Sequence, residues 1–220
     1  MAIAFDAQST TSQTGTTTTD AHTCTGSNLI LFAGVQGGTT DIVTGVTYSG
    51  VAMTQIAKVQ LPSADNRWLY LYYLVNPATG ANNIVATSSG SQTVRVCGAS
   101  YTGVKQTGQP DASTTATQTA GATTWSMSVT SVADNCWSLA FMRQGDGTVG
   151  AGSATTMRTV GSNFSAMFDS NAVIHPAGSS TLNFTTGNNI NPWAGIIASI
   201  APFIAAASSF SIFGDQQLVS

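Results

Sequence analysis

The chain has 220 residues, a formal net charge of −3 and only 7% charged residues, whereas an average soluble domain has about 25%. Its six basic residues stand singly along the sequence, with no stripe that could neutralise phosphates, so direct binding of nucleic acid is not expected. The length suits one large all-β domain or two small ones with a substantial core.

Residue usage favours strands joined by turns. All nine acidic residues are Asp, and Ser and Thr make up about a quarter of the chain. Asp favours turns and caps, whereas Glu favours helix interiors, and Thr fits the pleated surface of a strand. The composition therefore predicts an all-β protein.

In the first half of the chain, short β-patterned runs alternate with turn signals. Residues 3–7 are a candidate first strand, and the Thr-rich segment that follows, to residue 20, is predicted as a loop or an edge strand. LILFAGV is predicted as a buried strand, and residues 43–61 as a hairpin that turns at Ser49-Gly50, because glycine adopts positive φ readily. RWLYLYYLV, ended by Pro77, is the next strand.

The second half continues the same pattern after a predicted polar loop at 106–122. Its predicted strands are TWSMSVTSV, NCWSLAFM, TMRTVGS, SAMFDSN, STLNFTT and PWAGIIASIAP. About a dozen short strands at this spacing are typical of sandwiches and jelly rolls. We predict an antiparallel, jelly-roll-like β-sandwich over residues 1–202 and a C-terminal arm at 203–220, with a short helix near 203–207 as the only helical candidate.

The strand predicted at 67–75 is apolar or aromatic on both faces, unlike the one-sided strands of a two-layer antiparallel sandwich. Leaving several of these side chains in water would forfeit several kcal/mol, at about 25 cal/mol per Å² of apolar surface. We expect a neighbouring subunit to cover the second face. The alternative is a loop of the same chain, such as 106–122.

The cysteines and the apolar runs predict neither a disulfide framework nor a membrane anchor. Cys24, Cys97 and Cys136 are odd in number and lack CxxC spacing, so we interpret them as buried thiols. The N-terminus lacks the basic and apolar regions of a secretory signal. The longest apolar run, at 193–207, is too short to span a membrane and is broken by Pro202, so we expect a protein made in a cytoplasm, without a membrane partner.

No motif points to catalysis. His22 and His175 lie outside metal-binding spacings, and no GxSxG elbow is present. No two aspartates stand out as the acid and base of a glycosidase, since the surroundings of several favour turns: Asp65, Asp111, Asp134 and Asp146. We therefore expect no enzyme, no cofactor and no metal.

Several segments together resemble a recurrent β-sandwich module of tailed-bacteriophage virion proteins, which also occurs in bacterial surface or phage-derived open reading frames. They are HTCTGSNLILFAGV, GVTYSGVAMTQIAK, LYLYYLVNPATGANNIVAT, ASYTGVKQTGQPDA and WAGIIASIAP. The resemblance covers about residues 1–202 and includes no functional residues. It implies a structural role in the virion, in the head or the tail.

From this resemblance we expect a capsid decoration, or cement, protein that packs on the major capsid protein or other virion proteins and on sister copies. A homo-oligomer is expected, with a trimer as the candidate. The residues expected at the interface are Ile3, Phe5, Phe210, Ile212, Phe213 and Leu218.

Two other functions remain open at this stage. A tail or fibre adhesion module would bind host glycans through exposed rings, because sugars stack on aromatic faces; its candidates are Trp125, Trp193 and Tyr101. A place in the core or at an interface is the favoured explanation of these rings. A carbohydrate-active enzyme ranks last.

Overall fold

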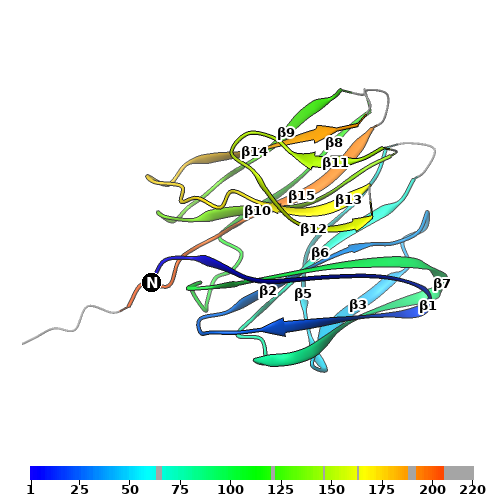
Figure 1. Ribbon diagram of the computed structural model, residues 1–220, viewed down its shortest axis with the longest axis horizontal. Helices are drawn as coiled ribbons and strands as arrows, with labels where there is room; N and C mark the ends of the chain where they lie inside the picture. The colour runs from blue at the N-terminus through cyan, green and yellow to red at the C-terminus, as the bar shows by residue number, and fades with distance from the viewer. Residues whose placement is uncertain (63–65, 120–121, 146, 163, 188–191, 206–220) are drawn as a thin grey trace, which may run out of the picture.

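A computed structural model of the chain describes residues 1–62, 66–119, 122–145, 147–162, 164–187 and 192–205. These residues form three antiparallel β-sheets and contain no helix (Figure 1). The prediction of an all-β antiparallel sandwich is confirmed, whereas its jelly-roll connectivity is not. The short helix expected near 203–207 is absent over 203–205, the part of it that is described.

The largest sheet comes from the first half of the chain. Its seven strands run in the order β4-β3-β7-β2-β6-β5, with β1 beside β7. They are β1 (Ala4–Cys24), β2 (Ile30–Gln36), β3 (Val43–Tyr48), β4 (Val51–Ala52), β5 (Thr54–Gln60), β6 (Trp68–Val75) and β7 (Gly80–Thr102).

The second half of the chain forms two smaller sheets. The five-stranded sheet, in the order β12-β13-β10-β15-β8, contains β8 (Ala112–Gln118), β10 (Trp137–Gln144), β12 (Thr156–Ser162), β13 (Ser165–Asp169) and β15 (Trp193–Ile200). The three-stranded sheet, in the order β11-β14-β9, contains β9 (Thr124–Thr130), β11 (Val149–Ala151) and β14 (Ser179–Thr186).

The seven-stranded sheet folds over itself because its two longest strands bend together. The first part of β1, to Gly15, pairs with the second part of β7, and from Thr17 onward β1 pairs with the first part of β7. β2 pairs with the second part of β7, whereas β3 pairs with the first part. The two halves of the sheet therefore face each other across an apolar core that includes Tyr48 and Tyr70.

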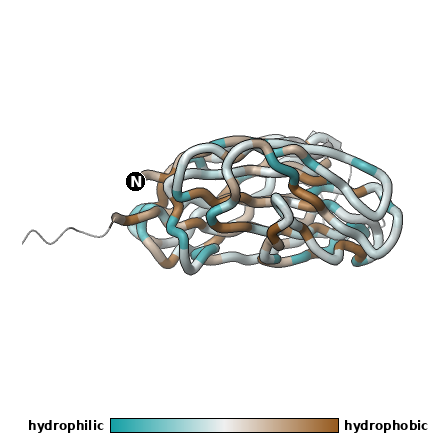
Figure 2. The backbone as a smooth tube through the Cα atoms, turned by 90° about the horizontal axis from the view of Figure 1, so that it is seen from below, coloured by the Kyte–Doolittle hydropathy of each residue, from teal (hydrophilic) through white to brown (hydrophobic). Residues whose placement is uncertain are grey.

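Two further apolar cores lie between the stacked sheets. Phe32 and Leu71 of the large sheet pack in one cluster with Phe141 of the five-stranded sheet. The other face of the five-stranded sheet packs against the three-stranded sheet through a cluster that includes Phe168 and Phe184. Figure 2 shows the result, with hydrophobic segments running side by side through the body of the molecule.

The strand RWLYLYYLV illustrates why this stacking matters. In β6, Leu69 and Leu71 face the core shared with the five-stranded sheet, while Tyr70 and Tyr72 face the core inside the folded large sheet. All four are buried by their own chain. The expectation that a neighbouring subunit covers the second face is therefore wrong, because the chain supplies more than two layers.

Of three other local predictions, one is wrong, one is decided in favour of an edge strand, and one is confirmed. The segment 106–122 is not a continuous polar loop, since β8 (Ala112–Gln118) lies within it and pairs with β15. The Thr-rich segment before residue 20 is an edge strand, because it belongs to β1, which lies at the side of β7. The turn at Ser49-Gly50 is confirmed, with φ of 49° and 79°, as a two-residue hairpin turn of the primed type requires.

Candidate functional site

Several polar side chains meet where the two halves of β1 face each other. Burial in the second half of β1 alternates, so that Asp20 and His22 point inward between the layers. Asp20 is 3% exposed and His22 is 2% exposed. Ser9, from the first half of β1, and Ser100, from β7, meet them there.

These side chains form an unbroken chain of hydrogen bonds. Ser9 Oγ lies 2.5 Å from Asp20 Oδ2 and 2.8 Å from His22 Nδ1. His22 Nε2 lies 3.0 Å from Ser100 Oγ, which in turn lies 2.7 Å from Asp6 Oδ2. We call these five residues the β1 polar chain. Gly98 makes room for it, because a Cβ there would lie 2.5 Å from Ser9 Oγ and 3.0 Å from His22 Nδ1.

Burial controls the electrostatics of the β1 polar chain. Desolvation raises the pKa of Asp20 to about 6, against the lowering effect of its hydrogen bond with Ser9. Desolvation also lowers the pKa of His22 to about 4, although the charge of Asp6 opposes this shift. Both shifts have the expected cause, since a buried site disfavours the charged form of either group.

This arrangement differs from a Ser-His-Asp triad. In a triad a carboxylate holds one ring nitrogen of the histidine and the nucleophile meets the other. Here both ring nitrogens face serine hydroxyls, and each carboxylate is hydrogen-bonded to a serine rather than to the imidazole. The imidazole is also buried, so we do not assign catalysis to it.

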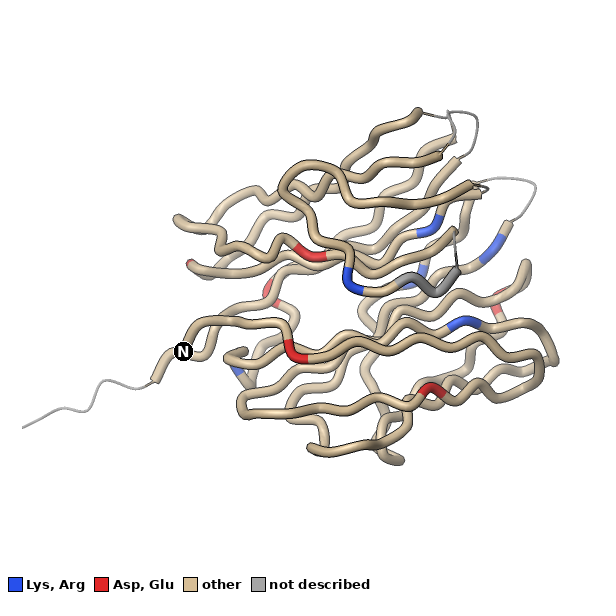
Figure 3. Tube along the Cα trace, viewed as in Figure 1, with Lys and Arg blue, Asp and Glu red and all other residues tan. Residues whose placement is uncertain are grey.

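The other residues considered for chemistry are dispersed. His175 is exposed in the loop before β14. Asp111 accepts hydrogen bonds from the backbone N–H groups of Val132 and Ala133, and Asp134 accepts one from Ala177. Both aspartates lie outside the strands, as predicted, but these bonds join separate segments of the chain rather than close a local turn. Asp65 and Asp146 lie outside the described residues. Figure 3 shows the few charged residues spread over the described part of the fold, where Lys58 pairs with Asp41 and Arg158 pairs with Asp169.

The rings considered for glycan binding belong to the protein interior. Trp125 and Trp193 stack on each other with centroids 4.6 Å apart, and both lie in the core beneath the three-stranded sheet. Tyr101 is fully buried in the core between the two larger sheets. Trp125 is 8% exposed and lines a cavity of about 360 Å³ together with Ser153 and Asn183. Most of each ring is nevertheless buried, so the structure supports the interior explanation of these rings.

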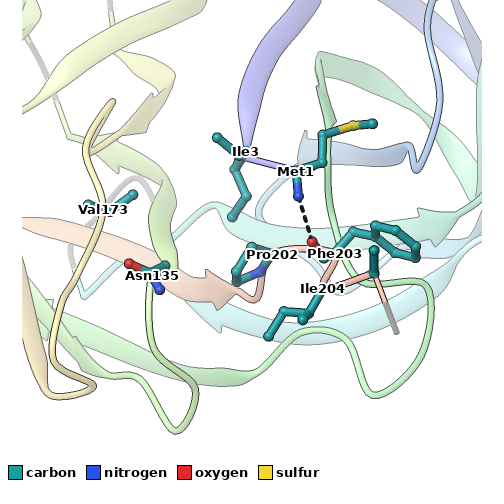
Figure 4. A pocket seen from close by; sticks show the side chains of 9 residues that line it. Met1, Ile3, Asn135, Val173, Pro202, Phe203 and Ile204 are labelled. Atoms are coloured by element: carbon teal, nitrogen blue, oxygen red, sulfur yellow. Dashed lines mark hydrogen bonds between the residues drawn. The ribbon is translucent and has the colours of Figure 1, made fainter. Parts of the chain in front are cut away.

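Exposed apolar side chains gather at one end of the molecule, where the N-terminus meets the segment after β15 (Figure 4). Met1 is 65% exposed, Val173 is 55% exposed and Ile204 is 80% exposed, and all three line a cavity of about 310 Å³. A second cavity, of about 590 Å³, shares Ile204 and Phe203 with the first. We call the surface formed by Met1, Val173, Phe203 and Ile204 the end face.

Backbone hydrogen bonds hold the end face in place. The N–H of Phe203 donates to the carbonyl of Gly103 over 2.8 Å, and the N-terminal ammonium of Met1 donates to the carbonyl of Phe203 over 3.0 Å. Val104 and Pro202 form an isolated bridge beside them. The end face is therefore a fixed surface up to Phe203.

The residues predicted at an interface fall into two groups. Ile3 is buried and Phe5 is partly buried in the core between the two larger sheets, and Ile3 also lines the first cavity of the end face. Their contacts within the chain account for their apolar character, and a contact with another molecule stays a prediction. The remaining four lie outside the described residues: Phe210, Ile212, Phe213 and Leu218.

Sequence reasoning missed the β1 polar chain and the end face. The inward alternation of Asp20, His22 and Cys24 in β1 was a visible signal of a buried polar strand face. No signal paired that face with Ser9, because the pairing depends on the bend of β1. The end face joins residues near both termini, which only the fold brings together.

No protein-family model matches the sequence, and neither curated proteins nor solved structures yield a match. Within the described ranges, no three or more His, Cys, Asp or Glu residues group so that they could hold a metal ion. The same residues include no helix that is long and apolar enough to cross a membrane.

Proposed function

We propose that this protein is a structural component of a tailed-bacteriophage virion, a head decoration protein that contacts capsid subunits through its end face. The observation that carries the proposal is the gathering of Met1, Val173 and Ile204 on one surface. Other exposed apolar side chains, such as Val51, Val132 and Met157, lie outside this surface, and it is grouped apolar side chains that mark interaction sites. The pattern of strand segments shared with phage virion modules supplies the class of partner.

The architecture is compatible with this role. Three stacked cores give an extensively buried interior, which suits a part that must keep its shape in a particle. The two-sided strands no longer support a partner, because the chain itself covers both faces of β6. The proposal is therefore supported by two observations, the end face and the sequence resemblance.

The direct test is to locate the chain. Phage particles would be purified from the host that carries this sequence, analysed by mass spectrometry and labelled with a gold-coupled antibody against the protein. We expect its peptides in the particles and the label on the heads. Particles without the protein would refute the proposal, and label confined to the tail would refute the assignment to the head.

A binding test addresses the end face itself. Heads lacking the protein would be mixed with the full-length chain or with variants, and co-sedimentation would measure binding. Val173→Asp combined with Ile204→Asp should weaken binding at least tenfold, because both place a charge on the apolar surface. Val51→Asp is the matched control, since Val51 is an exposed valine in the β3–β4 hairpin. Equal binding by the double variant would exclude the end face as the contact.

A further inference from the structure

The β1 polar chain has more hydrogen-bond links than hydrogens to fill them when both of its carboxylates are ionised. It has four links, namely Asp20–Ser9, Ser9–His22, His22–Ser100 and Ser100–Asp6, and each link requires one hydrogen. With both carboxylates ionised and the imidazole neutral, the serine hydroxyls supply two hydrogens and the imidazole supplies one. Three hydrogens cannot complete four links.

We propose that the β1 polar chain is a binding site for one additional proton, carried by Asp20, which completes the hydrogen bonds that hold the two halves of β1 together. The geometry supports this directly. Ser9 comes from the first half of β1, while Asp20 and His22 come from the second, so the Ser9 links join the two halves across the bend at Gly15 and Thr17. This inference concerns the interior of the large sheet and does not depend on the proposed function.

In the protonated state, all four hydrogen bonds donate in the same direction, from Asp20 toward Asp6. The Asp20 carboxylic acid donates to Ser9 Oγ, and the Ser9 hydroxyl donates to His22 Nδ1. His22 Nε2–H then donates to Ser100 Oγ, and the Ser100 hydroxyl donates to Asp6. All four links are made, with Asp6 as the terminal carboxylate.

The alternative carrier is His22, as an imidazolium that donates to both serines while the serines donate to the two carboxylates. That arrangement also completes four links, but it places a charge on both Asp20 and His22, which are buried. Burial disfavours both charges, which agrees with a pKa of about 4 for His22 and about 6 for Asp20. Asp20 is therefore the carrier.

The neighbouring titratable groups leave this assignment intact. Asp6 also accepts hydrogen bonds from the backbone N–H and the hydroxyl of Thr25, so it remains an acceptor. Burial raises the pKa of Cys24, and it raises the pKa of Tyr48 to about 12. On the side of β12, Arg158 stacks over Phe5 and pairs with Asp169. Because their pKa values are raised, Cys24 and Tyr48 stay protonated between pH 5 and 8.

Loss of the proton changes which nitrogen of the His22 imidazole carries the hydrogen. When Asp20 is ionised, the Ser9 hydroxyl donates to it, so Ser9 Oγ can only accept from the ring. His22 must then carry its hydrogen on Nδ1, and one of the links at Ser100 lacks a hydrogen. The tautomer of His22 therefore reports the state of the site.

Nuclear magnetic resonance of the full-length protein, labelled with ¹³C and ¹⁵N, tests the proposal between pH 4 and 8. The Asp20 carboxyl should titrate near pH 6, about two pH units above an exposed aspartate. The His22 ring should stay neutral above pH 5 and change from the Nε2–H to the Nδ1–H tautomer over the same range. An Asp20 carboxylate that stays ionised down to pH 4, or a tautomer that does not change, would overturn the proposal.

Two variants sharpen the test. In Asp20→Asn the side-chain amide donates to Ser9 as the carboxylic acid does, so His22 should keep the Nε2–H tautomer at every pH from 5 to 8. Ser12→Ala, an exposed position on the same strand, should keep the wild-type change. A tautomer change in Asp20→Asn like that of the wild type would contradict the role of Asp20. If that variant does not fold, the wild-type titration still decides.

Discussion

The Tyr101 hydroxyl of β7 donates a hydrogen bond of 2.9 Å to Asp169 Oδ2 of β13, joining the large sheet to the five-stranded sheet. Arg158 Nε donates to the same oxygen over 2.6 Å, and the Arg158 guanidinium lies 4.2 Å from the ring centroid of Phe5. Asp169 is fully buried. A buried carboxylate must be paired to be tolerated, so these contacts fix how the two parts of the chain pack.

Tyr101→Phe should therefore destabilise the whole chain. The substitution removes one hydrogen bond to a buried charged group, a contribution of about 1.5–3 kcal/mol, and leaves the ring packing in place. Chemical denaturation followed by fluorescence measures the free energy of unfolding. Tyr72→Phe is the control, because the Tyr72 hydroxyl bonds to the neutral amide oxygen of Gln55, and its loss should be smaller, about 0.5–1.5 kcal/mol. A smaller loss for Tyr101→Phe than for Tyr72→Phe would contradict this explanation.

Gly34→Ala should show that the two larger sheets approach too closely for a side chain. A Cβ at Gly34 would lie 2.4 Å from Cδ2 of Phe141, so the ring must move within a packed core, at a cost of about 1–3 kcal/mol. Gly45→Ala, also in the large sheet, would meet nothing within 4 Å and should be neutral or slightly stabilising. Thermal unfolding of the two variants makes the comparison. Similar melting temperatures would argue against close approach at Gly34.

Asp20→Asn should change how stability depends on pH. The raised pKa of Asp20 gives stability that is present below its unfolded value of 3.8 and is lost as the pH rises through about 6. The lowered pKa of His22 gives stability that is present above 6.5 and is lost as the pH falls through about 4. In the wild type these two contributions oppose each other between pH 4 and 6.

Removing the Asp20 contribution leaves that of His22. The free energy of unfolding of Asp20→Asn should fall by roughly 1–3 kcal/mol between pH 6.5 and 4, because one pKa unit corresponds to about 1.4 kcal/mol. Urea unfolding at a series of pH values gives the slope. Ser12→Ala, at an exposed position of β1 that carries no titratable group, should retain the wild-type profile. Parallel profiles for the Asp20 and Ser12 variants would rule out this linkage.

The cysteines should be unreactive in the folded protein. Cys24, Cys97 and Cys136 are all buried thiols, which confirms the interpretation drawn from the sequence. Burial raises the pKa of Cys136 to about 12, and the thiolate is the reactive form. Ellman's reagent at pH 8 should label less than one thiol per native chain and all three in denaturant. Rapid native labelling of two or more would show that the fold opens readily.

The sequence predicted the strands better than it predicted what covers them. Alternating and two-sided apolar runs located β2, β6, β10 and β15, because the period of side-chain direction in a strand is a local property. The same runs did not reveal that β6 lies between two layers of its own chain. Strand β8 was missed because its Ser and Thr residues have the composition of a loop.

The candidate sites were less predictable than the strands. Asp20 and His22 alternate visibly on one strand, but Ser9 reaches them only because β1 bends, and Ser100 is 78 residues from His22 in the sequence. The end face unites Met1 with Val173 and Ile204. Such contacts depend on which strands become neighbours, and local patterns do not specify that choice.

The sequence by itself determined the all-β class, the hairpin at Ser49-Gly50, the burial of the thiols and the sparse charge, because each follows from residue type and near-neighbour spacing. Only the tertiary structure decided that the large sheet folds over itself, that both faces of β6 are covered from within, and that a buried proton site forms along β1. Those outcomes depend on long-range packing, because apolar strand faces are buried by segments that are distant in the sequence. Here the chain is long enough for its own segments to bury them.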